Sequence, residues 1–161
     1  GADTLRASNT RGMLVSGTSG NDLLYGGNQR DVLVGGLGLD RLEGGGGEDI
    51  VIGGRTTFDT NLTAMIGVLS EWSRTGVGSS IQERYNNLSN VSPSASRLNE
   101  NFFLRGLEFT TGRTLNDDNA VDQLFGQAET DWFIGGTVAN DFATTDYSAD
   151  QIRSTSFRNM I

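Results

Sequence analysis

The stretch from Gly35 to Ile52, GGLGLDRLEGGGGEDIVI, contains the pattern that decides the fold. It holds two copies of the unit Gly-Gly-x-Gly-x-Asp-x-apolar-x, in which Asp40 and Asp49 take the aspartate position. Two degraded copies precede it, because Asp22 and Asp31 extend the same spacing toward the N-terminus. The apolar positions of these units are Leu24, Leu33, Leu42 and Val51. A flexible glycine-rich linker would not keep an apolar residue at every ninth position, so the pattern predicts a repeat architecture.

Each unit is predicted to form a turn followed by a short strand. Glycine adopts positive φ without steric cost, so the first part of the unit can turn sharply, and the residues after the aspartate are β-formers. Two units make one coil of roughly eighteen residues, and coils stack at the ~4.8 Å strand spacing with the apolar residue inside. The sequence therefore predicts a mostly β fold, a right-handed parallel β-roll, with a short helical insertion further along the chain.

Stacked turns in such a roll bring carboxylates together. Asp22 is expected over Asp40, and Asp31 over Asp49. Two unscreened carboxylates ~5 Å apart repel by about 3 kcal/mol at an effective dielectric near 20, so the arrangement is unfavourable without a cation. Turn carbonyls can complete an all-oxygen shell of about six or more ligands, which suits calcium better than magnesium. The sequence thus predicts several bound calcium ions.

This nonapeptide unit resembles the repeats-in-toxin (RTX) family of calcium-binding repeats. The resemblance implies calcium held between stacked turns, and a roll that forms on secretion into calcium-rich surroundings. It places the metal ligands on the four aspartates and on carbonyls near Gly20, Gly38 and Gly47. In the second copy Gln29 stands at a turn-glycine position, so an altered geometry is expected in that turn.

After Asp59 the apolar spacing becomes helical. A helix is predicted from Leu62 to Ser73, after a cap at Thr60 or Asn61, and a second one from Ser80 to Leu88. A β signal follows in two short runs, Phe102-Phe103-Leu104 and Leu107-Glu108-Phe109. The predicted division is 1–58 for the calcium-binding repeats, 59–98 for a helical and loop insertion, and 99–161 for resumed, degenerate repeats with a tail. All three are expected to form one structural unit.

The repeat returns in eroded form near the C-terminus. Leu115, Leu124 and Phe133 stand nine apart, and Asp122 and Asp131 precede the last two by two residues. These two aspartates are therefore further candidate metal ligands. The residues from Met65 to Trp72 and from Asp118 to Phe133 are similar to end regions of large secreted bacterial surface proteins, which implies location and no particular activity.

The opening residues continue the pattern toward the N-terminus. Leu5 and Leu14 stand nine apart as expected inward positions, with one extra residue before Leu24. The first repeat is cut at its fourth position, which exposes the edge of the roll and suggests head-to-tail assembly into a filament. After Asn140 the tail is expected to form either a last irregular coil or the remnant of a secretion signal.

Composition excludes several classes of protein. The chain of 161 residues has 23 Gly and no Cys or His, so it can build neither disulfides nor the usual zinc sites. Its net charge of −8 argues against nucleic-acid binding, and all 12 basic residues are Arg, which leaves no lysine nucleophile. No apolar run approaches the ~20 residues of a membrane span. We therefore expect no enzymatic activity and no membrane span.

These features predict a secreted, extracellular calcium-binding structural module at the cell surface. It is expected to belong to a surface layer, adhesin or filament, and to bind copies of itself or other surface proteins. The alternative is a carbohydrate-binding module of a secreted polysaccharide-acting protein. A weak indication for a polysaccharide partner is that Arg30 and Arg41 lie in neighbouring repeats.

Overall fold

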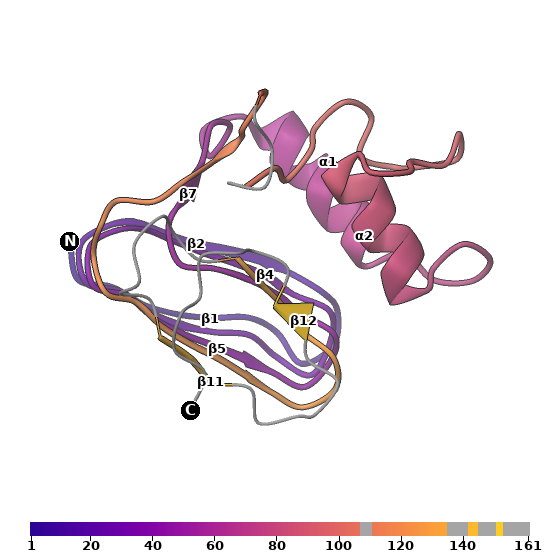
Figure 1. Cartoon of the computed structure of the whole chain (residues 1–161). Helices are drawn as coiled ribbons and strands as arrows, with labels where there is room; N and C mark the ends of the chain where they lie inside the picture. The colour runs from indigo at the N-terminus through magenta and orange to yellow at the C-terminus, as the bar shows by residue number, and fades with distance from the viewer. Residues whose placement is uncertain (107–110, 135–141, 145–150, 153–161) are drawn as a thin grey trace.

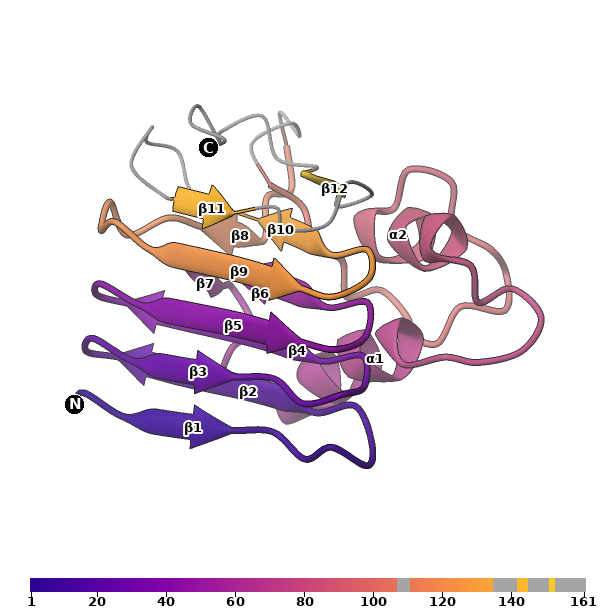
Figure 2. The same cartoon turned by 90° about the horizontal axis from the view of Figure 1, so that it is seen from below.

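Stacked parallel strands form the frame of the protein (Figure 2). The computed structural model describes residues 1–106, 111–134, 142–144 and 151–152. One sheet contains, in spatial order, β1 (Thr4–Arg6), β3 (Leu23–Tyr25), β5 (Arg41–Gly45), β9 (Gln123–Gln127) and β11 (Phe142–Thr144). The other contains β12 (Gln151–Ile152), β10 (Trp132–Ile134), β6 (Ile50–Ile52), β4 (Val32–Leu37) and β2 (Leu14–Ser19). The chain alternates between the two sheets, and the strand neighbours in both are parallel.

The strand register is that of a β-roll with two repeats in each coil, as Figure 1 shows in the view along the stack. Leu24 pairs with Leu42 in the first sheet, and Leu33 pairs with Val51 in the second. The eroded repeats rejoin the same stack, because β9 pairs with β5 and β10 pairs with β6. In the tail, β11 and β12 add to β9 and β10. The predicted β-roll fold and its resumption near the C-terminus are thus confirmed, and the tail supplies strands of a last coil.

The apolar position of each repeat points between the two sheets. This inner core consists of Val15, Leu24, Leu33, Leu42, Val51, Leu124 and Phe133, with Leu5 and Ala7 packed against it. All of the repeat-position leucines in it are fully buried. Burying one such side chain contributes about 1.5–3 kcal/mol, so each coil adds to a continuous apolar column.

The expected inward position in β2 was wrong. Val15, and not Leu14, pairs with Leu33 and lies in the inner core. Leu14 faces the opposite side and packs against the outer apolar cluster. The extra residue therefore lies in the turn between β1 and β2. Successive strand residues point to opposite faces, so a shift by one residue in the turn exchanges the two faces of the strand.

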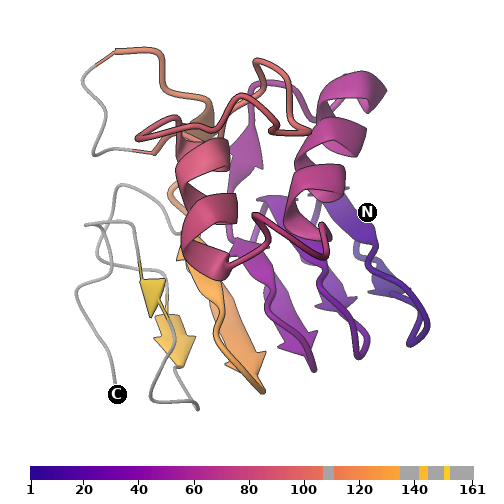
Figure 3. The same cartoon turned by 90° about the vertical axis from the view of Figure 1, so that its right-hand side faces the viewer.

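Two helices cover the outer face of the second sheet (Figure 3). They are α1 (Leu62–Trp72) and α2 (Ile81–Ser89), within one residue of the predicted helices. Trp132 of β10 packs against Trp72 of α1 and Tyr85 of α2, with ring centroids 5.9 and 4.9 Å apart. The strands beneath supply apolar residues on both faces, and the outward ones are Val32, Val34, Ile50, Ile52, Trp132 and Ile134. This sheet is consequently buried on both sides.

Local capping defines the start of both helices. The Asn61 side chain accepts a hydrogen bond from the Ala64 backbone N, and Ser80 and Glu83 form a capping box. The expected strand at Phe102–Leu104 was wrong, since these residues form no strand. Leu104 instead joins the outer cluster, and its backbone N donates to the Leu88 carbonyl. The other expected run, Leu107–Phe109, lies outside the described residues.

The helical segment is inserted inside one turn of the roll. The chain leaves the stack after Gly54 and rejoins it at Asp122, and the short antiparallel strands β7 (Arg55–Thr56) and β8 (Leu115–Asn116) lie near the two ends of the insertion. Asp122 stands 82 residues after Asp40, whereas Asp40 stands 18 residues after Asp22. The division at residues 58 and 98 stays a prediction.

Candidate metal sites

An aspartate ends each turn and binds the coil before it. Oδ1 of Asp40 accepts a hydrogen bond from the Asp22 backbone N at 2.8 Å, and Oδ1 of Asp49 accepts one from the Asp31 backbone N at 2.8 Å. Asp22 accepts one in the same way from the Asp3 backbone N at 2.8 Å. The stacking of Asp22 with Asp40 and of Asp31 with Asp49 is therefore present as predicted.

The second carboxylate oxygen of three of these aspartates is buried without a hydrogen-bond partner. These atoms are Oδ2 of Asp22, Asp40 and Asp49. Each side chain belongs to a residue that is at most 2% exposed. Leaving a buried carboxylate oxygen unsatisfied is costly, because the charge has lost its water and gained nothing in exchange. Three such atoms in successive turns of the roll indicate that a cation binds to these carboxylates.

The first glycine of each turn makes room for this oxygen. A Cβ on Gly35 would stand 2.6 Å from Oδ2 of Asp40, and one on Gly44 would stand 2.5 Å from Oδ2 of Asp49. No side chain fits there, which explains why the repeat begins with glycine. The carboxylate is thereby folded back into its own turn.

Backbone carbonyls face the gaps between stacked turns. The Gly20 carbonyl oxygen is directed at Gly38, and the Gln29 carbonyl oxygen lies 2.6 Å from where a Cβ on Gly47 would be. Gly20, Gly38 and Gly47 occupy equivalent positions with φ of 119°, 123° and 104°, in the left-handed region that favours glycine. The predicted glycine positions thus share one backbone conformation, and their role as metal ligands stays a prediction.

The donor set fits calcium. Within residues 1–106 and 111–134, no three His, Cys, Asp or Glu side chains gather at one point, so a carboxylate-only site is not formed. Each turn instead ends in one buried aspartate beside backbone carbonyl oxygens. Calcium binds shells of carboxylate and carbonyl oxygens.

The turn from residue 26 to residue 31 departs from the others. Gly27 and Gln29 are not among the described residues with positive φ, whereas the equivalent positions in the neighbouring turns are. Oδ2 of Asp31 accepts a hydrogen bond from the Gly27 backbone N at 2.6 Å. This carboxylate is satisfied by its own turn, as the glutamine at a glycine position had suggested. Asp31 is therefore the weakest of the four aspartate candidates.

Asp122 and Asp131 occupy the same positions in the next coil. Oδ1 of Asp122 accepts from the Asp40 backbone N at 2.8 Å, and Oδ1 of Asp131 accepts from the Asp49 backbone N at 2.7 Å. A Cβ on Gly53 would stand 2.6 Å from Oδ2 of Asp122. Gly53 and Asp122 therefore form the two ends of a single turn, although the whole helical insertion lies between them.

Burial raises the pKa values of three aspartates, Asp31, Asp40 and Asp49. The pKa of Asp40 is raised to about 6, mainly by burial, with a contribution from the negative charges of Asp22 and Asp118 and against the effect of the Asp22 backbone hydrogen bond. Burial likewise raises the pKa of Asp49 to about 10, with added repulsion from Asp131 and other carboxylates. Burial is also the main reason that the pKa of Asp31 is raised. Without a cation the turns therefore favour protonated carboxyls.

We expect acid to stabilise the calcium-free protein. The folded pKa of Asp40 lies above the unfolded value, so the folded form binds more protons and stability falls as pH rises from about 4 to about 6. The shift corresponds to on the order of 3 kcal/mol. Because calcium removal is expected to unfold the roll at pH 7, thermal unfolding in chelator should show no cooperative transition at pH 7 and a transition that reappears when the pH is lowered to 5. No recovery of a transition in acid would contradict this assignment of the carboxyls.

Asp40→Asn is expected to reduce calcium binding more than Asp3→Asn. Asp40 is buried and has an unsatisfied oxygen, whereas Asp3 is exposed and contributes its backbone N to the Asp22 carboxylate. Calorimetric titration measures the bound calcium of both variants, and Asp3→Asn should resemble the parent. Equal losses from the two variants would show that the register of the sites is incorrect.

The sequence did not indicate that the turn of residues 44–49 is hydrogen-bonded to the helices. The Glu48 carboxylate accepts hydrogen bonds from Arg30 and Arg84, and its backbone carbonyl accepts one from Trp72 Nε1 at 2.7 Å. Arg84 is fully buried, lies over the Trp72 ring at 4.5 Å and also donates to the Trp72 carbonyl. Glu48 directly precedes Asp49 in its turn. The helical insertion is thus joined to a candidate calcium turn.

The fold and the site together define a parallel β-roll built on stacked, glycine-rich aspartate turns. Residues 14–42 and 25–55 match the family model of the RTX calcium-binding nonapeptide repeat (4 copies). Residues 14–55 are therefore RTX repeats, a type of repeat that binds Ca²⁺ between its turns and is typical of secreted proteins. Comparison with curated proteins and with solved structures found no match. In the described part of the chain, no helix is long and apolar enough to cross a bilayer.

Proposed function

We propose that this RTX module is an extracellular structural unit of a surface layer, adhesin or filament. Its turns bind calcium in the range of ~10⁻⁴ to 10⁻³ M that extracellular modules use, so that the roll is stable outside the cell. The proposal assigns no enzymatic activity to the chain. The observation that carries it is an apolar groove with exposed lining residues beside helix α1.

An apolar groove lies between residues 11–14 and helix α1. It has a volume of about 370 Å³, and its lining includes Leu14, Leu62 and Ile66. Leu62 is 72% exposed and Ile66 is 54% exposed. Exposed apolar side chains that line a groove favour a protein contact at this surface. We therefore propose that a second copy of this chain binds here, in a head-to-tail contact that extends without closing.

Light scattering in millimolar calcium tests the assembly. The full chain should form particles larger than a monomer, which a chelator should dissolve. Ile66→Glu places a charge in the groove and should reduce assembly, while Val77→Glu changes an equally apolar residue that is 97% exposed and does not line the groove. A strictly monomeric protein at high concentration would overturn the filament proposal and leave calcium binding untouched.

A carbohydrate-binding role is the second candidate. The two arginines that suggested this role lie in different parts of the roll. Arg30 binds Glu48 in a turn, and Arg41 lies on the outer face of the first sheet. On that face, however, Arg41 lies 4.2 Å from the Phe125 ring centroid and donates to Gln123. Aromatic, amide and guanidinium groups together suit sugars. Binding to a glycan array would favour this role, and its absence would remove it.

A further inference from the structure

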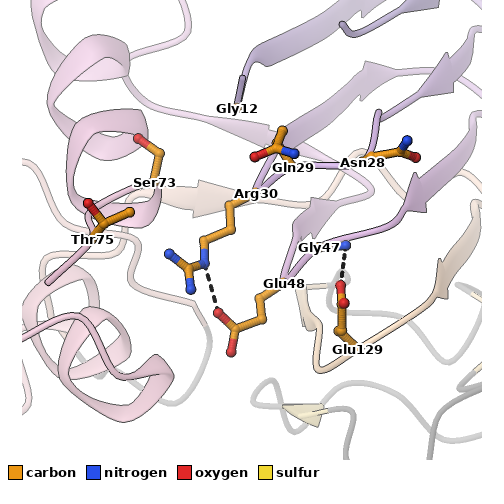
Figure 4. A pocket seen from close by; sticks show the side chains of 9 residues that line it. All are labelled: Gly12, Asn28, Gln29, Arg30, Gly47, Glu48, Ser73, Thr75 and Glu129. Carbon is orange, nitrogen blue, oxygen red and sulfur yellow. Dashed lines mark hydrogen bonds and ion pairs between the residues drawn. The ribbon is translucent and has the colours of Figure 1, made fainter. Parts of the chain in front are cut away.

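Two acidic side chains outside the aspartate position of the repeat lie on the glycine turns. Oδ2 of Asp118 accepts a hydrogen bond from the Gly38 backbone N at 2.6 Å, and the Glu129 carboxylate accepts one from the Gly47 backbone N (Figure 4). Asp118 lies in the segment that returns from the helical insertion, and Glu129 lies in the turn between β9 and β10. Each side chain thus reaches from the coil of β9 and β10 to a turn next to β5 in the coil before it.

Each of these carboxylates lies near a buried aspartate that has an unsatisfied oxygen. Asp118 is bonded to the turn that Asp40 ends, and Glu129 is bonded to the turn that Asp49 ends. Oδ2 of Asp40 and Oδ2 of Asp49 have no hydrogen-bond partner, and the two residues are 2% and 0% exposed. The negative charges of Asp118 and Glu129 are close enough to raise the pKa of Asp40 and of Asp49. The turns thus pair Asp40 with Asp118 and Asp49 with Glu129, and among the described ion pairs none involves these four carboxylates.

The same arrangement occurs on both sides of the roll. The turn of residues 35–40 faces the split turn that ends at Asp122, and the turn of residues 44–49 faces the turn that ends at Asp131. In the gap one coil earlier, between the turns that end at Asp22 and Asp40, the described contacts include no such additional carboxylate on the Gly20 turn. The carboxylates of Asp118 and Glu129 thus lie in the two gaps between the coil of β5 and β6 and the coil of β9 and β10.

From this juxtaposition, we propose that Asp118 and Glu129 are additional calcium ligands, one for each gap between the coil of β5 and β6 and the coil of β9 and β10. The inference rests on calcium binding by the roll. Ligand charge sets the affinity of calcium sites, so these two gaps bind calcium more tightly than the gap between the turns that end at Asp22 and Asp40. They fill first as calcium rises. Calcium bound in these gaps holds the chain that returns from the insertion against the coil of β5 and β6.

The Glu129 side of the roll is open to solvent. A pocket of about 460 Å³ is lined by Glu129 together with Gln29, Gly47 and Glu48 (Figure 4). A metal site needs an entry path, and this pocket leads from solvent to the turn that Asp49 ends. The cation therefore has direct access to this gap in the folded roll.

Calorimetric calcium titration of Asp118→Asn and Glu129→Gln tests the inference. Both replacements keep an amide oxygen that can accept from Gly38 or Gly47, so they remove the charge and preserve the hydrogen bond. The parent should show a tight class of sites and a weaker class. Each variant should weaken one tight site by on the order of tenfold or more, and leave the weaker class unchanged. Glu43→Gln is the matched control, because Glu43 carries the same charge but binds Arg41 on strand β5.

The outcomes separate this inference from the function on which it rests. Titrations of Asp118→Asn and Glu129→Gln that match the parent would overturn the additional ligands while calcium binding stands. Absence of calcium uptake by the parent itself would overturn the calcium module. Circular dichroism at saturating calcium shows whether each variant has folded. If either does not fold, Asp118→Glu or Glu129→Asp keeps the charge and moves the carboxylate by one methylene, so it should weaken one tight site and leave the weaker class unchanged; a tight class identical to that of the parent would refute the role.

Discussion

Complete removal of calcium is expected to unfold the roll. The buried aspartates stack in successive coils, and Asp22, Asp40 and Asp49 each hold an oxygen with no hydrogen-bond partner. The binding sites do not exist in the unfolded chain, so calcium binding free energy is also folding free energy. At a calcium concentration of 100 times the dissociation constant, one site contributes about 2.7 kcal/mol, which for several sites rivals the whole stability of a domain.

Circular dichroism with and without chelator measures this effect. The β signal and the cooperative thermal transition should be lost on chelation and should return when calcium is added in excess. Magnesium at the same concentration is the control, since it demands a tighter octahedral shell and should restore little. An unchanged spectrum and melting temperature after complete calcium removal would show that the inner apolar column is sufficient by itself.

Glu48→Ala should destabilise the protein by about 3 kcal/mol, which is the lower end of the cost of breaking a buried ion pair. Arg84 is fully buried and would lose its carboxylate partner. The lower end applies because Arg84 keeps hydrogen bonds to the Ser79 and Trp72 carbonyls. The loss should detach the helical insertion from the turn that Asp49 ends and weaken calcium binding there.

Tryptophan fluorescence and calcium titration together test this connection. Trp72 and Trp132 pack against each other between the helices and the second sheet, so separation of the insertion should expose them. Glu43→Ala is the control, because the Arg41–Glu43 pair is partly exposed and such pairs contribute about 0–1 kcal/mol. If Glu48→Ala and Glu43→Ala have equal effects on fluorescence and affinity, the turn and the insertion are not coupled.

The sequence alone was sufficient for the roll, because each coil repeats the same local information. A glycine opens every intact unit, and an aspartate and an inward apolar residue follow at fixed distances. Asp122 and Asp131 could be assigned to the resumed stack for the same reason, although few of their turn glycines remain. The residues beside the inward apolar positions carry a further signal. Val32, Val34, Ile50 and Ile52 flank the inward positions of the second sheet, whereas Arg41 and Glu43 flank one in the first. This difference indicates which sheet the helices cover.

Only the tertiary structure revealed where the insertion is attached and what it binds. The split turn joins Gly53 to Asp122 across the entire helical segment, and no local pattern specifies such a closure. The contacts of Glu48 with Arg84, and of Asp118 with Gly38, likewise join residues far apart in the chain. Repeat spacing determines contacts between coils because they recur at a constant separation. Contacts made by an insertion have no period, so they depend on the packing of its helices against one particular face of the roll.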